Sequence, residues 1–368
     1  MTTIAKRPKV FGTGLIALDL VVGVDPNSPV QSWAGGTCGN VIAILAYLGW
    51  KAFPIARMNG DPASNRVRAD LRRWGVGLEF TGCGPTSHTP IIVQQIRRAS
   101  DGSPTHRFSW SCPRCGKRLP AFKAVTQDAV EMVAPSLPGT AVFFMDRLSR
   151  AVLTLAARAS AEGAVVVFEP SGTSGEKLVA EAIQLAHVVK YSDQRLAAIG
   201  SAMQVGSATL VEVQTLGAEG LRYRHRLGKG ISTWLHLNAI PAPRLVDTCE
   251  SGDWCTAGFA TKAAAGGQAG MLQGGADGIR RALRYGQALA AWNCGFEGAR
   301  GGMYAVKREM FRNQVEALLK GRANLSSVET KMVAGLPIAC PACPPDKPDA
   351  AGSRLHHPRR FITNVAAA

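Results

Sequence analysis

The 368-residue sequence has no long hydrophobic run and no extended block of like charge. No stretch of it approaches the roughly 20 apolar residues that span a bilayer. The basic residues near Met1 are not followed by an apolar run of signal-peptide length. These absences lead us to expect a cytoplasmic protein. With 46% hydrophobic and 18% charged residues, the composition is that of a globular chain able to bury a substantial core.

Acidic residues are too few to balance the basic ones. The chain has 42 Lys and Arg against 26 Asp and Glu, a net charge of +16. Such an excess favours an anionic partner, namely a nucleotide, a phosphorylated substrate or nucleic acid. The basic residues are dispersed, however, and genome composition explains the high Arg content equally well. A nucleic-acid partner would rest on charge and on cysteine pairs alone, so we do not expect one.

One stretch carries the clearest chemical signal. Residues 246–253 (VDTCESGD) are predicted to be a strand end and a turn of small residues, and residues 254–260 (WCTAGFA) continue as a helix. Such a turn leaves the first N–H groups of the helix unpaired, where an anion can bind. Asp253, in this turn, can accept a proton from a hydroxyl placed beside the anion. The alternative is an ordinary strand, turn and helix with a capping Asp.

A second glycine turn lies nearer the N-terminus. Residues 33–40 (WAGGTCGN) open an Ala-rich helix that runs to about Trp50. Before it, residues 9–22 are predicted to be a first apolar strand, interrupted by Gly12 and Gly14, that carries Asp19. A buried carboxylate in such a strand needs a hydroxyl or N–H partner, because burying an unpaired charge is costly. The alternative is that Asp19 turns back to solvent.

Together and in this order, the two turns resemble the G-G-x-x-x-N and D-T-x-G-A-G-D signatures of the ribokinase-like (PfkB-type) carbohydrate kinases. The resemblance implies an ATP-dependent kinase that transfers the γ-phosphoryl group to a hydroxyl of a sugar or sugar-like small molecule. It implies that Asp253 is the catalytic base and that the amides around Ser251, Gly252 and Asp253 form an anion hole. It also implies four acceptor-binding residues: Asp19, Gly35, Gly36 and Asn40.

A third match concerns the nucleotide. The stretch 214–220 (QTLGAEG) is similar to the family's T-L-G-x-x-G turn, which lies against the nucleotide. The stretch 293–299 stands where the family closes its adenine pocket. The resemblance therefore implies four cofactor-binding residues: Thr215, Gly217, Gly220 and Asn293.

Two departures from the family pattern bear on activity. Glu250 stands where the family usually has Gly, and its carboxylate would repel a phosphate unless it turns away or meets a cation. The N-x-x-E motif that helps hold Mg²⁺ through water is replaced by Ser192, Asp193, Gln194 and Arg195. Mg²⁺ is expected to arrive largely with the nucleotide, because it keeps most of its waters.

Beyond Met132 the sequence alternates between apolar strands and helices. Val-rich strands at 141–145, 164–168, 187–191 and 208–213, separated by helices at 149–162 and 177–185, predict a parallel sheet covered on both faces. Helices are predicted at 253–265, 278–292 and 303–320. With the resemblance, this pattern implies a three-layer α/β/α sandwich with a mostly parallel central sheet and a small β-sheet lid, formed by parts of 12–38 and 80–125. We expect one kinase domain over 1–330 and a C-terminal extension over 331–368, mobile from residue 344.

The nine cysteines fall into two groups. Five are scattered among apolar or small residues and are predicted to be buried thiols of a reducing compartment. The other four form two CxxC pairs, which together supply the ligands of a tetrahedral structural zinc site, within one chain or between two: Cys112, Cys115, Cys340 and Cys343. Because the pairs lie far apart in the sequence, the fold must bring them together. Redox-active, disulfide-forming or unliganded thiols are the alternatives.

Three further interpretations stay open. Within the family, the acceptor is a sugar or a nucleoside; Phe108 and Trp110 could stack on a base, although packing inside the lid is favoured for both. A catalytically weak nucleotide- or sugar-binding regulatory protein is a second class of function, motivated by Glu250 and the lost N-x-x-E. A homodimer is compatible with the resemblance. Asp146 and Arg147 follow a central strand and could contact the substrate, although a surface ion pair is favoured for them. We also expect one face of the last helix to pack in the core: Val306, Met310, Val315 and Leu318.

Overall fold

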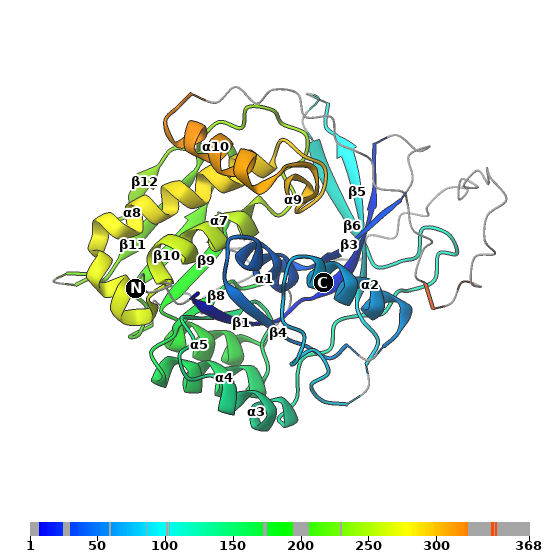
Figure 1. The fold of residues 1–368 in the computed structure, drawn as a ribbon, viewed down its shortest axis with the longest axis horizontal. Helices are drawn as coiled ribbons and strands as arrows, with labels where there is room; N and C mark the ends of the chain where they lie inside the picture. The colour runs from blue at the N-terminus through cyan, green and yellow to red at the C-terminus, as the bar shows by residue number, and fades with distance from the viewer. Residues whose placement is uncertain are drawn as a thin grey trace, which may run out of the picture.

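The computed structural model describes residues 7–24, 30–58, 60–85, 87–100, 102, 104–171, 175–193, 206–228, 230–322, 340–341 and 343 (Figure 1). Two β-sheets organise this part of the chain. The larger has eight strands in the order β12-β11-β10-β9-β8-β7-β1-β4, and the smaller has four in the order β3-β2-β5-β6. The tail from residue 344, expected to be mobile, lies outside the described residues, as do Gln194 and Arg195.

The large sheet is mostly parallel, as predicted. Its strands pair in parallel from β4 through β1, β7, β8 and β9 to β10, and β11 and β12 add an antiparallel edge. The inner strands are short and apolar because helices cover both of their faces. The bounds are β1 Lys9–Thr13, β4 Lys51–Ile55, β7 Val142–Met145, β8 Val165–Phe168, β9 Val188–Ser192, β10 Val211–Thr215, β11 Leu221–His225 and β12 Leu235–Leu237.

Successive residues of the central strands face opposite helical layers. Phe11 and Phe143 pack in the cluster that includes α3, α4 and α5, whereas Val10 and Phe144 pack in the cluster that includes α1, α7 and α8. Figure 1 shows these two layers on either side of the large sheet, with α10 outside α8. The three-layer α/β/α sandwich is therefore confirmed. The helix bounds are α1 Thr37–Tyr47, α2 Pro62–Arg73, α3 Asp128–Val133, α4 Arg150–Ala161, α5 Glu176–Leu185, α7 Ser251–Phe259, α8 Gly267–Asn293, α9 Gly301–Ala305 and α10 Arg308–Leu319.

The small sheet consists of β2 (Ala17–Val22), β3 (Gln31–Gly35), β5 (Ile91–Arg98) and β6 (Pro104–Ser109). The prediction of a single strand over 9–22 is wrong, because β1 and β2 belong to different sheets. The chain leaves β1 through Gly14, whose φ is 142°. A Cβ at Gly14 would lie 1.7 Å from Asp146 Oδ1, so the chain can pass this carboxylate only with glycine there.

The C-terminal helices differ in extent from the prediction. Helix α7 continues as a π-helix over Ala260–Ala264. Helix α8 begins at Gly267 rather than at Gly278, with a kink at Gly275. The predicted helix over 303–320 is divided between α9 and α10. Helices α7 and α8 cross closely, since a Cβ at Gly286 would lie 2.4 Å from Cys255 O.

Several burial predictions can be compared with the structure. The five scattered thiols are buried, as expected: Cys38, Cys83, Cys249, Cys255 and Cys294. Val306, Val315 and Leu318 are buried too, but Met310 is 48% exposed, and Phe311 occupies the core instead. The lid-core interpretation of Phe108 and Trp110 is wrong, because they are 44% and 54% exposed. Within the described ranges, no helix combines the length and the apolar character needed to cross a membrane.

Candidate active site

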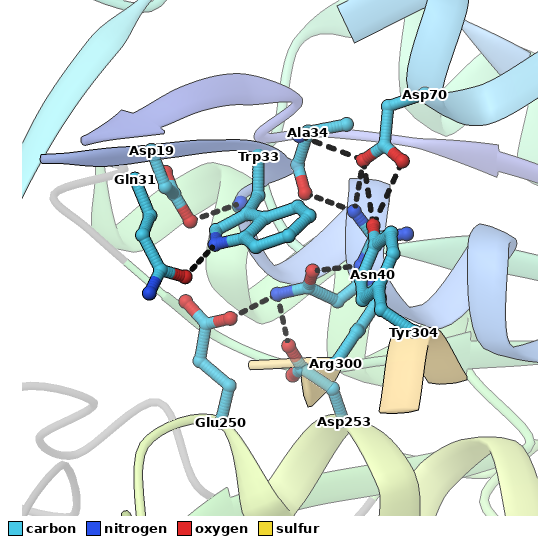
Figure 2. Close-up of polar contacts among 11 residues, drawn as sticks. Asp19, Gln31, Trp33, Ala34, Asn40, Asp70, Glu250, Asp253, Arg300 and Tyr304 are labelled. Atoms are coloured by element: carbon cyan, nitrogen blue, oxygen red, sulfur yellow. Dashed lines mark hydrogen bonds and ion pairs between the residues drawn. The ribbon is translucent and has the colours of Figure 1, made fainter. Parts of the chain in front are cut away.

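The two signature turns meet at the first turns of α1 and α7. Asn40, in α1, donates from Nδ2 to Asp253 Oδ2 at 3.0 Å (Figure 2). The same amide donates to Glu250 Oε2. Asp253 lies in the first turn of α7 and is 5% exposed. The fold thus brings together Asn40 and Asp253, which the sequence places far apart.

Asp253 has the electrostatic character of a proton acceptor. Burial raises the pKa of the Asp253 carboxyl well above its usual value, and the nearby Glu169 carboxylate raises it further. The Asn40 amide and the Lys190 ammonium lower it in part. A raised carboxyl pKa brings proton affinity closer to that needed for general-base work near neutral pH.

Asp247 holds the turn that leads into α7. Its Oδ1 accepts from Cys249 N at 2.8 Å, and its Oδ2 accepts from Gly298 N at 2.8 Å. His106, in β6 of the small sheet, places Nε2 2.8 Å from Asp247 Oδ1. The small sheet therefore contacts the turn directly, through a residue that the sequence did not single out.

A cation lies beside the start of α7. A Cβ at Gly252 would be 3.4 Å from Lys190 Nζ, so the ammonium of this β9 residue sits against the turn. Lys190 Nζ is 3.0 Å from Glu169 Oε2, and Thr256 donates to the other oxygen of Glu169. Burial opposes the charge on Lys190, but the surrounding groups, Glu169 first among them, together raise the pKa of Lys190. A helix N-terminus with an adjacent ammonium is suited to an anion.

The backbone amides of this turn differ in availability. Asp253 N donates to Glu250 O at 2.9 Å, whereas Ser251 N makes only a 3.4 Å bond to Thr248 O. Of the three predicted anion-hole residues, Ser251 and Gly252 are thus better placed than Asp253 to offer an N–H group. The sequence analysis did not predict a role for Lys190, because a single Lys in an apolar strand is a weak signal.

On the other side of Asn40, Asp19 projects from β2. Asp19 Oδ2 accepts from Gly36 N at 3.3 Å, and a Cβ at Gly35 would lie 1.7 Å from the same oxygen. Glycine at position 35 therefore makes room for this carboxylate, and Gly36 adopts φ 77° at the start of α1. Burial raises the pKa of Asp19 to about 7, although the Gly36 N–H and the Arg300 guanidinium lower it. The alternative that Asp19 turns back to solvent is wrong.

A small cavity lies at this point, between the small sheet and the segment around Arg300. Asp19, Trp33, Gln94, Arg300 and Tyr304 are among the residues that line it. Three buried atoms on its wall have no hydrogen-bond partner in the described structure: Asp19 Oδ1, Gln94 Nε2 and Arg300 Nη1. Buried polar atoms are normally paired, so this cavity has the character of a site for a polar ligand.

Arg300 links the cavity to Asn40. Its Nε donates to Asn40 Oδ1 at 3.0 Å, and its Nη2 is 2.8 Å from Asp70 Oδ2 (Figure 2). Tyr304 donates to Asp70 at 2.8 Å, and its ring packs at a tilt against the ring of Trp33, with 4.2 Å between centroids. The sequence signalled Arg300 only as a charged residue in a Gly- and Ala-rich loop, and we did not single it out.

The predicted nucleotide-binding residues fall into two places. Thr215 ends β10 beside Ser192 of β9, and Gly217 and Gly220 close the following turn, where Leu216 N bonds Gly220 O at 2.8 Å. These residues share one edge of the large sheet with the end of β9. Asn293 is instead buried, and its side chain holds the loop that carries Arg300, donating to Ala299 O at 3.0 Å and accepting from Gly302 N at 3.3 Å.

Asp146 and Arg147 form an ion pair, with Arg147 Nη1 3.1 Å from Asp146 Oδ2. The pair is not on the surface, because Asp146 is only 1% exposed. Asp146 Oδ1 accepts from Leu15 N at 2.9 Å, and Oδ2 accepts from Ser171 Oγ at 2.9 Å. The expectation of a surface pair is therefore wrong: Asp146 fixes the path of the chain between β1 and β2. Burial raises its pKa to about 6.

The two CxxC pairs meet within one chain, just beyond the end of β6. The four Sγ atoms lie within 4.8 Å of one another. Cys112 Sγ is 3.7 Å from Cys343 Sγ, and Cys115 Sγ is 3.8 Å from Cys340 Sγ. A tetrahedral zinc with Zn–S bonds of about 2.3 Å has edges of about 3.8 Å, so these separations fit a four-cysteine metal site. Residues 112–117 form a hairpin after β6, in which Gly116 N donates to Cys112 O and Cys112 N donates to Lys117 O.

Comparisons with known proteins agree with this geometry. Among solved structures, Arabidopsis thaliana ribokinase complexed with ribose and ATP superposes with a TM-score of 0.61 at 19% identity, over 86% of this chain and 99% of that chain. Xylella fastidiosa fructokinase with bound ATP gives 0.60 at 18%, over 79% and 93%. Burkholderia thailandensis nucleoside kinase in complex with inosine gives 0.61 at 16%, over 84% and 96%. These identities show a shared fold.

Sequence comparisons give the family. A search of the curated proteins found no match. The family model for pfkB family carbohydrate kinases matches residues 14–304. That range includes β2, both signature turns and Arg300. The chain therefore belongs to the pfkB family of carbohydrate kinases.

Proposed function

We propose that the protein is an ATP-dependent kinase that phosphorylates a hydroxyl of a sugar or sugar-like small molecule. The observation that carries the proposal is the buried Asp253 carboxylate at the start of α7, held by Asn40 and raised in pKa. It lies between the polar cavity at Asp19 and the ammonium of Lys190. A hydroxyl on one side and a phosphate on the other would both be within its reach.

In this proposal Asp253 removes the proton of the acceptor hydroxyl as the new O–P bond forms. The bond between the γ-phosphorus and the oxygen that bridges to the β-phosphate breaks, and ADP departs with that oxygen. The N–H groups of Ser251 and Gly252, with Lys190, stabilise the charge on the transferring group. Asp19 and Asn40 orient the acceptor, and the small sheet acts as a lid that excludes water.

Thr215, Gly217 and Gly220 are proposed to contact the nucleotide. Thr215 ends β10 and the two glycines lie in the turn that follows, at the edge of the large sheet where β9 also ends. Mg²⁺ would shield the phosphates when bound with ATP. Asp193, an exposed residue after β9, is the acid among the four residues that replace the N-x-x-E motif. Asn293 is proposed to shape the loop that carries Arg300, because its amide is used there. The four-cysteine cluster is proposed to bind one structural Zn²⁺ that ties Cys340 and Cys343 to the hairpin after β6.

The test measures ADP release with ATP and Mg²⁺ across a panel of sugars, polyols and nucleosides. Asp253→Asn should lower kcat by about 10²- to 10⁴-fold, the usual contribution of a general base. Asp277→Asn is the matched control, since this carboxylate is on the surface of α8 and 72% exposed. Acceptor-dependent turnover that survives in Asp253→Asn would contradict the assignment of the base.

A nucleoside acceptor is the alternative within the family. The observation that favours it is the exposure of Phe108 and Trp110 beside the small sheet, where they are available to stack on a base. A nucleotide- or sugar-binding regulator is the other candidate, favoured by Glu250 at a glycine position and by the replaced N-x-x-E motif. Ligand binding without turnover, equal in the wild type and Asp253→Asn, would support the regulator.

A further inference from the structure

Glu250 has an unusual backbone conformation. Its φ of 57° and ψ of 20° lie in the left-handed region, and it is the one non-glycine residue with positive φ among the described residues. An L-residue adopts this conformation at an energetic cost, and such strain is concentrated at functional sites. Glycine, which the family signature has here, would adopt it freely. The presence of Glu at this position therefore calls for a role of its side chain.

The Glu250 side chain turns away from the phosphate side of the turn. Its Oε2 accepts from Asn40 Nδ2, and Asn40 N in turn bonds Gly36 O at 2.9 Å. Asp19 accepts from Gly36 N. Both carboxylates therefore bond to the same first turn of α1 (Figure 2). The repulsion of phosphate that the sequence suggested is avoided by this direction.

The acceptor side of the site carries an excess of acid. Asp19, Asp70 and Glu250 face one guanidinium, that of Arg300, and Asp70 already pairs with it at 2.8 Å. Lys190 is paired with Glu169 on the other side of Asp253. Burial raises the pKa of Glu250 well above its usual value, and the Asp19 and Asp253 carboxylates raise it further, so a cation bound beside Glu250 would favour its ionised form. Asp19 Oδ1 is buried and without a hydrogen-bond partner in the described structure.

We propose that Glu250 and Asp19 together bind an ammonium group of the acceptor, so that the acceptor is an aminated sugar or polyol. The inference rests on the proposed kinase function and names its substrate class. An ammonium offers three N–H donors and no acceptor, which suits two neighbouring carboxylates better than a hydroxyl with one donor. The same acid excess disfavours an acceptor that carries a phosphate or carboxylate, because like charges would be buried together.

The test measures binding by calorimetry to the full-length protein without ATP, so that no turnover is needed. The probes are matched pairs: D-glucosamine with D-glucose, 1-amino-1-deoxy-D-fructose with D-fructose, and 3′-amino-3′-deoxyadenosine with adenosine. In at least one pair the amine should bind about 10-fold or more tightly than its hydroxyl partner, as expected for a charge-assisted bond. The preference should decrease as the pH approaches the pKa of the amine.

Glu250→Gln should reduce the ratio of the two affinities to near one, while the neutral partner changes by less than about 3-fold. Glu316→Gln, on an exposed residue of α10, is the matched control and should keep the ratio. Equal binding within every pair, no binding of any amine, or a ratio kept in Glu250→Gln would overturn the inference. Turnover of neutral sugars alone would overturn it while leaving the kinase in place. Amine-selective binding without Asp253-dependent ADP release would overturn the kinase instead.

Discussion

Removing the Asp19 carboxylate should stabilise the protein, and more so at higher pH. The unfolded chain releases the Asp19 proton near pH 3.8, whereas burial raises the pKa in the folded protein to about 7. Between these values unfolding releases a proton, so stability falls as the pH rises through this window. Asn at this position does not titrate, and Asp19→Asn should lose this part of the pH dependence.

The magnitude follows from the width of the window. The interval from about pH 5.5 to the folded pKa of about 7 is about 1.5 pH units. At about 1.36 kcal/mol per unit, the free energy of unfolding changes by about 2 kcal/mol over this interval. For 368 residues, an unfolding entropy of about 2.1 cal/mol/K per residue makes this about 2–3 °C in the thermal midpoint. Relative to the wild type, Asp19→Asn should therefore gain about 2–3 °C more at pH 8 than at about pH 5.5.

Tryptophan fluorescence during thermal unfolding, at several pH values and without ligands, would measure this difference. The cost of burying an unpaired amide is nearly independent of pH, so it cancels in the comparison. Asp277→Asn, on an exposed carboxylate, should show no such change. A shift between the variants that is the same at both pH values would refute the reasoning, because it would mean that Asp19 is ionised in the folded protein throughout.

Three further changes test other parts of the site. Lys190→Met should lower kcat by about 10²-fold, the effect of losing one charge-stabilising donor, with little change in the acceptor KM in steady-state assays. Cys115→Ser should abolish the binding of one zinc per chain in metal analysis and lower the thermal midpoint, whereas Cys83→Ser, outside the cluster, should keep the metal. Gly35→Ala places a methyl group 1.7 Å from the neighbouring carboxylate oxygen and should raise the acceptor KM by about 10-fold without changing the KM for ATP. Gly82→Ala, which meets open space, is its control, and equal KM values for the two alanine variants would contradict the role of Gly35.

The sequence was sufficient for the features that depend on local pattern. Val-rich strands separated by helices predicted the parallel sheet, and the glycine turns before α1 and α7 predicted where Asn40 and Asp253 would lie. The break between β1 and β2 was missed because it depends on Asp146, a residue far along the chain that occupies the space beside Gly14. The direction of the Glu250 side chain could not be predicted either, because it depends on the left-handed backbone conformation of this residue. That direction decides whether the carboxylate points toward a bound phosphate or away from it.

The residues that sequence reasoning missed share one property: each enters the site from an element whose position is set by the tertiary fold. Lys190 reaches the turn at Gly252 from the neighbouring β9, and Arg300 reaches Asn40 from the loop after α8.

His106 is a third such residue, and it enters the site from the small sheet. It brings β6 against Asp247, and the cysteine hairpin that begins at Cys112 follows β6 directly. A metal at the cysteine cluster would therefore hold Cys340 and Cys343 to the same strand that contacts the turn at the start of α7. If zinc positions that strand, Cys115→Ser should weaken acceptor binding as well as stability, and stability alone should fall if zinc acts only as a distant cross-link.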